Sequence, residues 1–310
     1  MLNMHRILLM TLLCTAASFT GAPPVTGQKP PDQNKPVEAG TQAEKRGVVA
    51  PGTKAKKLAS GFTWAEGPAE DSEGNLFFTD NRENRLYKMS PYGTVSLFLK
   101  EAHRANGLYP DRDGTIAACT GNPRQVVSIN REDGTMKVLV DSYEGKPLNA
   151  PNDLWIDPKG GIYFTDPYWG KEKGRDRVYY LAPDRKKLII AADDMVKPNG
   201  VIGTPDCKLL YVSDWNEKKT YVYSINEDGS LSKKRLFAPE GDDGLTIDTE
   251  GNIYLTGNAV TVYNPAGEKI DTIEVPETAA NVCFGGRDRQ TLFITARTSV
   301  YSIRLRVKGL

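Results

Sequence analysis

The chain of 310 residues has 40 lysine and arginine residues against 39 aspartate and glutamate residues, a formal net charge of +1. This balance gives no electrostatic reason to expect nucleic acid or an anionic membrane surface as a partner. The 29 glycines, 20 prolines and 39% hydrophobic residues are typical of a globular protein rich in turns.

The first 27 residues have the pattern of a secretory signal peptide. Arg6 precedes an apolar run over residues 7–14, and small residues follow it. This run is too short to span a membrane. Leu13 precedes Cys14 where a lipoprotein signal has a small residue, which argues against lipidation. We therefore predict a signal peptide at residues 1–27 and a secreted or periplasmic protein.

Residues 28–54 consist largely of Pro, Lys, Gln, Glu and Ala, with little that could form a core. This composition predicts a disordered linker. We expect the folded domain to cover residues 55–310.

A motif recurs six times in that region. Each copy has a short β-rich run that ends in a pair containing Thr or Ser, and a Glu, Asn or Asp stands fourteen or fifteen residues before the second member of the pair. The pairs are Thr79-Asp80, Cys119-Thr120, Thr165-Asp166, Ser213-Asp214, Thr256-Gly257 and Thr295-Ala296, and the upstream residues are Glu66, Asn106, Asn152, Asn199, Asp243 and Asn281. A nearly constant offset in six copies indicates six equivalent positions in space.

Further strands are predicted after each pair. A third strand is expected over residues 84–89, 125–129, 177–181, 220–225, 260–263 and 299–304, and a fourth over segments such as 94–99 and 186–190. Four strands at a period of about 40 to 48 residues are typical of a β-propeller. We predict an all-β, six-bladed propeller with four-stranded blades around a central channel. Residues 56–59 are expected to complete the last blade and to close the ring without an exposed sheet edge.

The first strand of each blade lines the channel of a propeller, so the six upstream residues are expected to surround one mouth of it. For a single Asn-Gly or Asp-Gly pair, a turn before a strand is an alternative interpretation. That alternative does not fit Glu66, which is a poor turn residue and follows a largely apolar segment of the chain. A buried carboxylate there would be costly without a cation or hydrogen bonds.

Histidine is nearly absent: the chain has only His5 and His103. No Gly-x-Ser-x-Gly motif occurs, which argues against a serine hydrolase, and a zinc site built on histidines is excluded. The remaining oxygen donors favour a hard divalent cation, which would allow hydrolysis of an ester or lactone. Asp243 or Asp153 could act as the base. Asp153 could instead bond only to the neighbouring backbone.

Several segments resemble one known family when they are taken in this order. They are residues 65–68 (AEGP), 150–154 (APNDL), 163–167 (YFTDP), 197–200 (KPNG), 243–245 (DGL), 281–286 (NVCFGG) and 292–297 (LFITAR). The chain thereby resembles the senescence-marker-protein/gluconolactonase family, six-bladed propellers that open sugar lactones with a divalent metal ion.

The resemblance implies that Glu66, Asn199 and Asp243 bind the metal directly. Asn152 would lie beside the ion, as a further ligand or a contact for the substrate. Asp243 would also accept and return a proton. One divalent cation is implied; calcium is expected first, with magnesium, manganese or zinc as alternatives.

Two positions depart from the family pattern. Ala150 stands where animal relatives have a substrate-binding arginine, and Cys119-Thr120-Gly121 replaces an acid-histidine pair of many bacterial relatives. The exact lactone is therefore left open. Asn106, Asp166 and Tyr168 are further candidates for binding it.

Alternative functions remain at this stage. A propeller could bind a sugar or a protein without catalysis, because the fold alone does not determine function. A strictosidine-synthase-like or paraoxonase-like activity is a third option. Trp169 and Trp215 could stack on a sugar, but we interpret them as packing residues of the rim. We expect a monomer or a weak oligomer.

Overall fold

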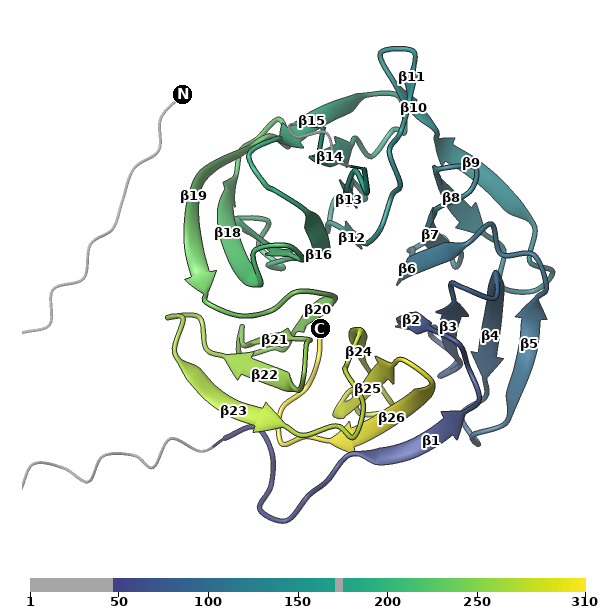
Figure 1. Cartoon of the computed structure of the whole chain (residues 1–310), viewed down its shortest axis with the longest axis vertical. Helices are drawn as coiled ribbons and strands as arrows, with labels where there is room; N and C mark the ends of the chain where they lie inside the picture. Colours follow the sequence, from purple (N-terminus) through teal and green to yellow (C-terminus); the bar gives the residue numbers. More distant parts are fainter. Residues whose placement is uncertain (1–46, 171–174) are drawn as a thin grey trace, which may run out of the picture. The chain divides into compact units, whose positions relative to one another are not determined.

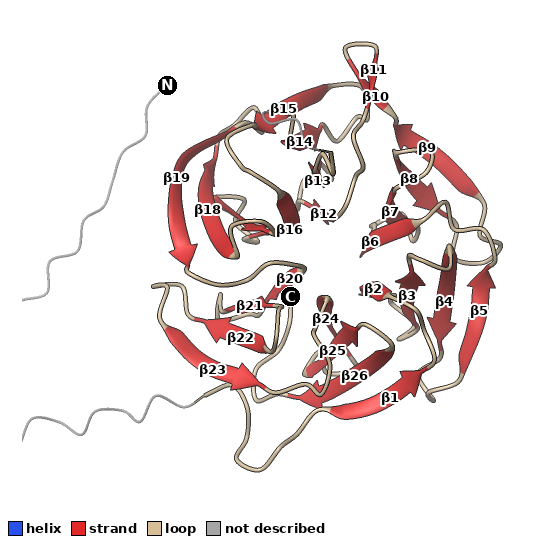
Figure 2. Ribbon diagram, viewed as in Figure 1, coloured by secondary structure: helices blue, strands red, loops and turns tan. Residues whose placement is uncertain are grey.

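The computed structural model describes residues 47–170 and 175–310. Its regular secondary structure in these ranges is entirely β-strand, in six four-stranded antiparallel sheets and one two-stranded hairpin. The sheets stand as blades around a common centre (Figure 1), and strands and loops account for all the described parts (Figure 2). The predicted six-bladed propeller is confirmed. In these ranges we find no helix suited to crossing a bilayer.

Three blades come from the first half of the folded region. Blade 1 contains β2 (Ala65–Glu70), β3 (Leu76–Asp80), β4 (Arg85–Met89) and β5 (Val95–Leu99). Blade 2 contains β6 (Ala105–Pro110), β7 (Ile116–Thr120), β8 (Gln125–Ile129) and β9 (Met136–Val140). The hairpin of β10 (Ser142–Tyr143) and β11 (Lys146–Pro147) leads to blade 3, with β12 (Leu154–Ile156), β13 (Ile162–Asp166), β14 (Arg177–Leu181) and β15 (Leu188–Ala192).

The remaining blades follow in chain order. Blade 4 contains β16 (Pro198–Gly203), β17 (Leu209–Asp214), β18 (Lys219–Ile225) and β19 (Leu231–Ala238). Blade 5 contains β20 (Leu245–Ile247), β21 (Ile253–Leu255), β22 (Val260–Tyr263) and β23 (Lys269–Ile273). Blade 6 contains β24 (Asn281–Gly285), β25 (Thr291–Ala296), β26 (Ser299–Arg304) and, as its outer strand, β1 (Lys56–Ser60).

The ring closes as expected, because β1 pairs with β26 in antiparallel register from Lys56 opposite Ser302 to Ser60 opposite Ser299. The Glu277 carboxylate strengthens this closure. It accepts hydrogen bonds from the Ser299 hydroxyl at 2.6 Å and the Tyr301 hydroxyl at 2.8 Å. The seam between the two ends of the domain is therefore held by backbone and side-chain bonds.

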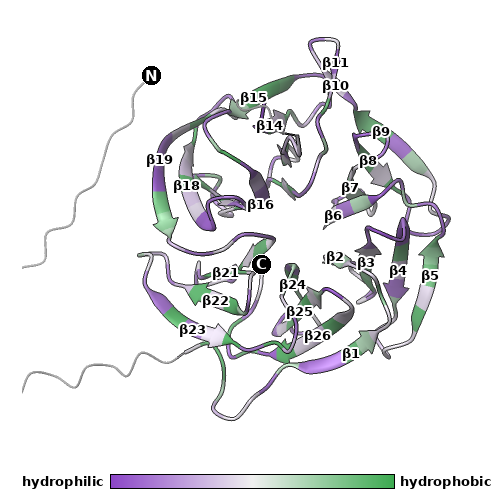
Figure 3. Cartoon of the chain, in the orientation of Figure 1, coloured by the Kyte–Doolittle hydropathy of each residue, from purple (hydrophilic) through white to green (hydrophobic). Residues whose placement is uncertain are grey.

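Burial follows the position of a strand in its blade. The second strands β3, β7 and β13 are buried along their whole length, because neighbouring blades pack on both of their faces. Outer strands such as β5 and β9 are partly exposed, and Figure 3 shows hydrophilic residues along β19. This explains the nearly continuous apolar runs that precede the repeated pairs.

The predicted leader and linker fall mostly outside the described residues. The signal peptide at 1–27 lies outside them entirely, and so does the predicted linker from 28 to 46. Residues 47–54, at the end of that linker, contact the propeller: Val48 is buried, and its carbonyl accepts a hydrogen bond from the Arg306 backbone.

Candidate functional site

A cleft of about 420 Å³ opens at one mouth of the channel. Five of the six upstream residues of the repeat line it, as the constant offset predicted. They are Glu66, Asn106, Asn152, Asn199 and Asp243. Glu66, Asn106 and Asn199 lie on the inner strands β2, β6 and β16, whereas Asn152 and Asp243 lie just before β12 and β20. Five blades thus direct two carboxylates and three amides to one place.

The repeated Thr or Ser positions these residues from the neighbouring blade. The Thr79 hydroxyl donates to the Asn106 carbonyl at 3.1 Å. The Thr165 hydroxyl donates to the Asn199 carbonyl at 2.6 Å, and the Ser213 hydroxyl donates to the Asp243 carbonyl at 2.6 Å. Each bond links the second strand of one blade to the cleft residue of the next blade. This explains why Thr or Ser recurs at the end of these second strands.

Glycines allow the backbones of adjacent blades to approach closely beside the cleft. A Cβ atom at Gly67, whose φ is +43°, would lie 1.9 Å from the Asn106 carbonyl oxygen, and one at Gly200 would lie 2.4 Å from the Asp243 carbonyl oxygen. The register also shifts within β2 and β16 next to Glu66 and Asn199. Bulges of this kind redirect side chains and are frequent at active sites.

Glu66 is buried, with only 3% of its surface exposed. Its Oε1 accepts a hydrogen bond from the Trp64 indole at 3.1 Å, whereas its buried Oε2 has no partner among the described residues. Burial raises the pKa of Glu66 to about 8, and the charge of Asp153 adds to this effect. A buried carboxylate oxygen without a partner is costly unless a proton or a cation compensates it, which makes Oε2 a candidate ligand atom.

Asn199 and Asp243 complete this oxygen cluster. The buried Asn199 Oδ1 also has no partner within the described ranges. Burial, followed by the charge of Glu66, raises the pKa of Asp243 well above its ordinary value. Asp243 keeps partial exposure through the cleft.

These donors fit a hard divalent cation, which takes carboxylate and amide oxygens. No group of three or more His, Cys, Asp or Glu side chains suited to a metal occurs in residues 47–170 and 175–310. The candidate set therefore depends on the Asn199 amide in addition to the Glu66 and Asp243 carboxylates.

Asn152 and Asn106 lie beside these three residues in the cleft lining. The Asn152 backbone is fixed on both sides, because its N–H donates to the Thr165 carbonyl at 2.9 Å and its carbonyl accepts from Gly107 N–H at 2.8 Å. Neither side-chain amide has a hydrogen-bond partner among the described residues, so both amides are available to a ligand.

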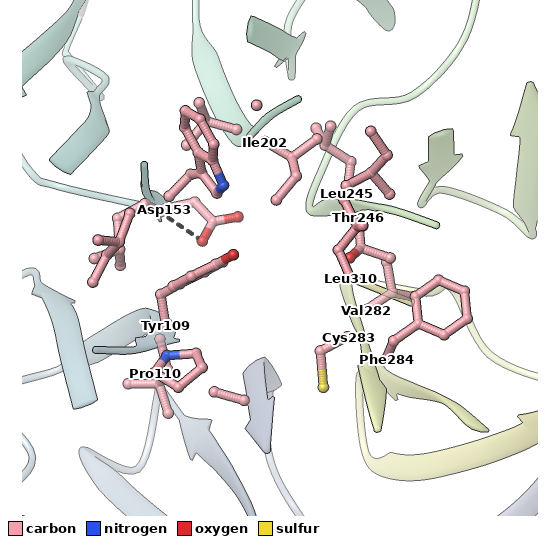
Figure 4. A pocket seen from close by; sticks show the side chains of 18 of the residues that line it. Tyr109, Pro110, Asp153, Ile202, Leu245, Thr246, Val282, Cys283, Phe284 and Leu310 are labelled. Carbon is pink, nitrogen blue, oxygen red and sulfur yellow. Dashed lines mark hydrogen bonds between the residues drawn. The ribbon is translucent and has the colours of Figure 1, made fainter. Parts of the chain in front are cut away.

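Asp153 does not line this cleft, although its charge helps to raise the pKa of Glu66 and Asp243 in it. It lines a cavity of about 290 Å³, where Figure 4 shows its carboxylate facing Tyr109. Asp153 Oδ1 accepts from Leu154 N–H at 2.9 Å, and its Oδ2 accepts from the Asn281 amide at 3.2 Å. Burial raises the pKa of Asp153 to about 7. Asn281, the sixth upstream residue, thus bonds to Asp153 and does not line the cleft.

Asp166 and Tyr168 also lie outside the cleft lining. Asp166 is 1% exposed, and its two carboxylate oxygens accept from the backbone N–H groups of Asn149 at 2.9 Å and Ala150 at 2.7 Å. Burial raises the pKa of Asp166 to about 6. The Tyr168 ring stacks under the Arg175 guanidinium at 4.3 Å. Asp166 therefore holds the loop that leads to Asn152.

Several cleft residues had no assigned role in the sequence. Trp64, Arg82 and Arg104 line the cleft. The only feature of the sequence that could have pointed to one of them is the short spacing from Trp64 to Glu66. Trp169 and Trp215 also line it, with 51% and 42% of their surfaces exposed and their ring centroids 5.8 Å apart. These two tryptophans contact each other edge to face and present aromatic surface to the cleft, so their exposure does not fit the expected role in rim packing.

Related sequences cover most of the folded region. The family model for the SMP-30/gluconolactonase/LRE-like region matches residues 64–298. A gluconolactonase of Zymomonas mobilis subsp. mobilis is 31% identical over 291 residues, which cover 81% of each chain. The lactonase drp35 of Staphylococcus aureus is 24% identical over 230 residues and covers 68% of this chain and 69% of its own length.

Solved structures show the same architecture. A gluconolactonase of Xanthomonas campestris superposes with a TM-score of 0.76 at 30% identity, covering 84% of this chain and 94% of that chain. Regucalcin of Agrobacterium tumefaciens, a calcium-binding protein, superposes with a TM-score of 0.73 at 20% identity, covering 83% and 96%. The family match includes every residue that lines the cleft. The chain therefore belongs to the SMP-30/gluconolactonase/LRE-like family.

Proposed function

We propose that the protein is a metal-dependent hydrolase that opens the ring of a sugar lactone in the cleft around Glu66, Asn199 and Asp243. The observation that carries the proposal is a pair of buried oxygens that have no partner in the described part of the chain, Glu66 Oε2 and Asn199 Oδ1. Membership of a family that contains gluconolactonases supports the choice of reaction.

One divalent cation would be held by Glu66, Asn199 and Asp243, with Asn152 beside it. Carboxylate and amide oxygens favour calcium, magnesium or manganese over softer metals. When bound, such an ion polarises the lactone carbonyl and stabilises the negative charge that develops on its oxygen.

The protein residues supply positioning and proton transfer. Asp243 is half-buried, lines the cleft and accepts no side-chain hydrogen bond from the described residues, so its carboxylate is free to take the proton of the attacking water. It returns that proton to the ring oxygen as the carbon–oxygen bond breaks. The free amides of Asn106 and Asn152 orient the hydroxyl groups of the sugar. Asp153 is not proposed as the base, because it lies outside the cleft lining and both of its carboxylate oxygens accept hydrogen bonds.

The test is lactone ring opening followed by the absorbance of a pH indicator. Metal-free protein is compared with protein supplied with Ca²⁺, Mg²⁺, Mn²⁺ or Zn²⁺ over a panel of aldonolactones. We expect activity that requires metal and is lost in Asp243→Ala. Asp242→Asn is the matched control, because Asp242 lies one residue away and pairs with Lys218. A folded, metal-loaded protein without activity on the panel would favour a non-catalytic binding propeller.

We also propose export through a signal peptide at residues 1–27 to the periplasm or the medium, with the folded protein as a monomer or a weak oligomer. The charged start and apolar run of the leader support export. Expression with the native leader should yield a chain that begins between about residues 18 and 28. N-terminal sequencing and light scattering measure the cleavage position and the oligomeric state.

A further inference from the structure

The cationic side chains around the cleft differ in how they are paired. On the side of blades 1 and 2, Arg82 and Arg104 line the cleft, and neither guanidinium group makes an ion pair or hydrogen bond with the described residues. On the side of blades 3 and 4, Lys197 and Lys218 lie over Trp169 and Trp215. Lys218 pairs with Asp242 at 2.6 Å, and Lys197 lies 3.8 Å from Asp176. Among the residues that line the cleft, the cations without a partner in the described ranges are thus Arg82 and Arg104.

The backbone of Arg104 is fixed in an uncommon conformation. Its φ of 51° lies in the left-handed region, which non-glycine residues rarely adopt. Its N–H donates to Asn84 Oδ1 at 2.6 Å, and its carbonyl accepts from the Asn81 amide and from Gly121 N–H, both at 3.0 Å. Three hydrogen bonds thus hold the residue in place while its side chain stays unbonded. Backbone strain of this kind is frequent at ligand-binding sites.

Arg82 is oriented in a different way. Its guanidinium lies 4.3 Å from the centre of the Trp64 ring, and the Trp64 indole donates to Glu66. Stacking on an aromatic ring restrains the guanidinium plane but leaves its N–H edges free. Arg82 is therefore connected, through Trp64, to the carboxylate that we assign to the metal.

We propose that Arg104 and Arg82 bind an anionic group of the substrate, a carboxylate or phosphate that the lactone carries away from its ring carbonyl. The inference rests on the proposed lactonase function and adds the substrate class. Guanidinium groups match carboxylate and phosphate oxygens in paired hydrogen bonds. Glu66 and Asp243 would repel such an anion, so it binds with its carbonyl toward the acids and its charged end toward the arginines.

Steady-state kinetics with three lactones tests the inference. Glucono-1,5-lactone is the neutral probe, a monolactone of glucaric acid carries a carboxylate, and the 6-phosphate of glucono-1,5-lactone carries a phosphate. We expect kcat/KM to be at least about tenfold higher for one anionic probe than for the neutral one, an advantage that weakens with salt. Arg104→Ala should lower the ratio of anionic to neutral kcat/KM by about tenfold, mainly through KM, and Arg82→Ala should lower it less.

Two further variants act as controls. Arg104→Lys keeps the charge without the paired geometry and should retain part of the preference. Arg235→Ala removes an exposed arginine from the outer strand β19 and should leave the ratio unchanged. A preference for the carboxylate or for the phosphate probe identifies the anionic group.

The outcomes separate this inference from the proposed function. Equal kcat/KM for neutral and anionic lactones, or a ratio that Arg104→Ala does not change, would overturn the inference and leave the lactonase intact. If no lactone is hydrolysed, calorimetry with gluconate and glucarate still tests the arginines without turnover. Tighter binding of the doubly charged glucarate that depends on Arg104 supports the inference, and equal binding overturns it.

Discussion

The buried carboxylate of Glu66 should make the metal-free protein less stable than a variant that lacks the charge. Glu66 is 3% exposed, one of its oxygens has no partner, and burial raises its pKa from 4.5 to about 8. We therefore expect Glu66→Gln to stabilise the metal-free protein at alkaline pH while it weakens metal binding. The same residue would thus have opposite effects in the two states.

The size of the effect follows from the pKa values. A carboxyl group whose pKa is raised on folding contributes most to the stability of the folded state below its unfolded pKa of 4.5. That contribution is lost as the pH rises toward 8. The loss is about 1.4 kcal/mol per pH unit, or about 4 kcal/mol at pH 8. The substituted amide leaves a buried N–H group unbonded, at a cost of about 1–3 kcal/mol. The net gain in free energy of unfolding should be about 1–3 kcal/mol at pH 8 and absent at pH 5.

Urea denaturation in the presence of EDTA, from pH 5 to pH 9, measures this difference. In a second series without EDTA, calcium should raise the urea midpoint of the wild type and have little effect on that of Glu66→Gln. Glu277→Gln is a control of opposite sign. Hydrogen bonds from Ser299, Thr298 and Tyr301 outweigh burial and lower the pKa of Glu277 to about 2, so removing its charge should cost about 2 kcal/mol at neutral pH. A Glu66→Gln variant that is less stable than the wild type at pH 8 without metal would refute the reasoning.

Two other substitutions test how the fold supports the site. Gly200→Ala would place a Cβ atom 2.4 Å from the Asp243 carbonyl oxygen. The affinity for metal, measured by calorimetry, should therefore fall by at least about tenfold. Gly257→Ala is the control and should have no effect, because its Cβ atom would meet an ordinary contact at 3.4 Å. Asp166→Asn should lower the free energy of unfolding by about 1–3 kcal/mol, because one backbone N–H would then face the NH₂ group of the amide and lose its acceptor. KM should stay unchanged. A raised KM with unchanged stability would show that Asp166 contacts the substrate instead.

The number and order of the blades could be predicted from the sequence because the repeat is local. A turn, an apolar run and a Thr or Ser at its end recur in every blade. In blades 1, 3, 4 and 5 the hydroxyl of that residue bonds to the next blade, as Thr165 bonds to Asn199. The constant offset from the cleft residue to that pair places the residue on an inner strand. The closure by β1 followed from the absence of a strand after Arg304.

The directions of individual side chains could not be predicted, because they depend on contacts between blades. Asn281 has the same offset as Asn199, yet it packs over Gly244, where a Cβ atom would lie 2.1 Å from it, and reaches Asp153. Asp166 follows its strand like Asp80 and Asp214, and all three accept backbone N–H groups of the loop before their own inner strand.

The sequence by itself determined the six blades and their six upstream residues, since these depend on residues close together in the chain. The family, and with it the Glu66, Asn199 and Asp243 candidates, came from the resemblance of short segments in several blades. Only the tertiary structure showed that Arg82 and Arg104 line the same cleft without an ion pair to any described residue, and that Asp153 lines a separate cavity. Such facts depend on loops from different blades that converge at one mouth of the channel. A periodic pattern along the chain does not indicate which charged side chains remain without a partner at that mouth.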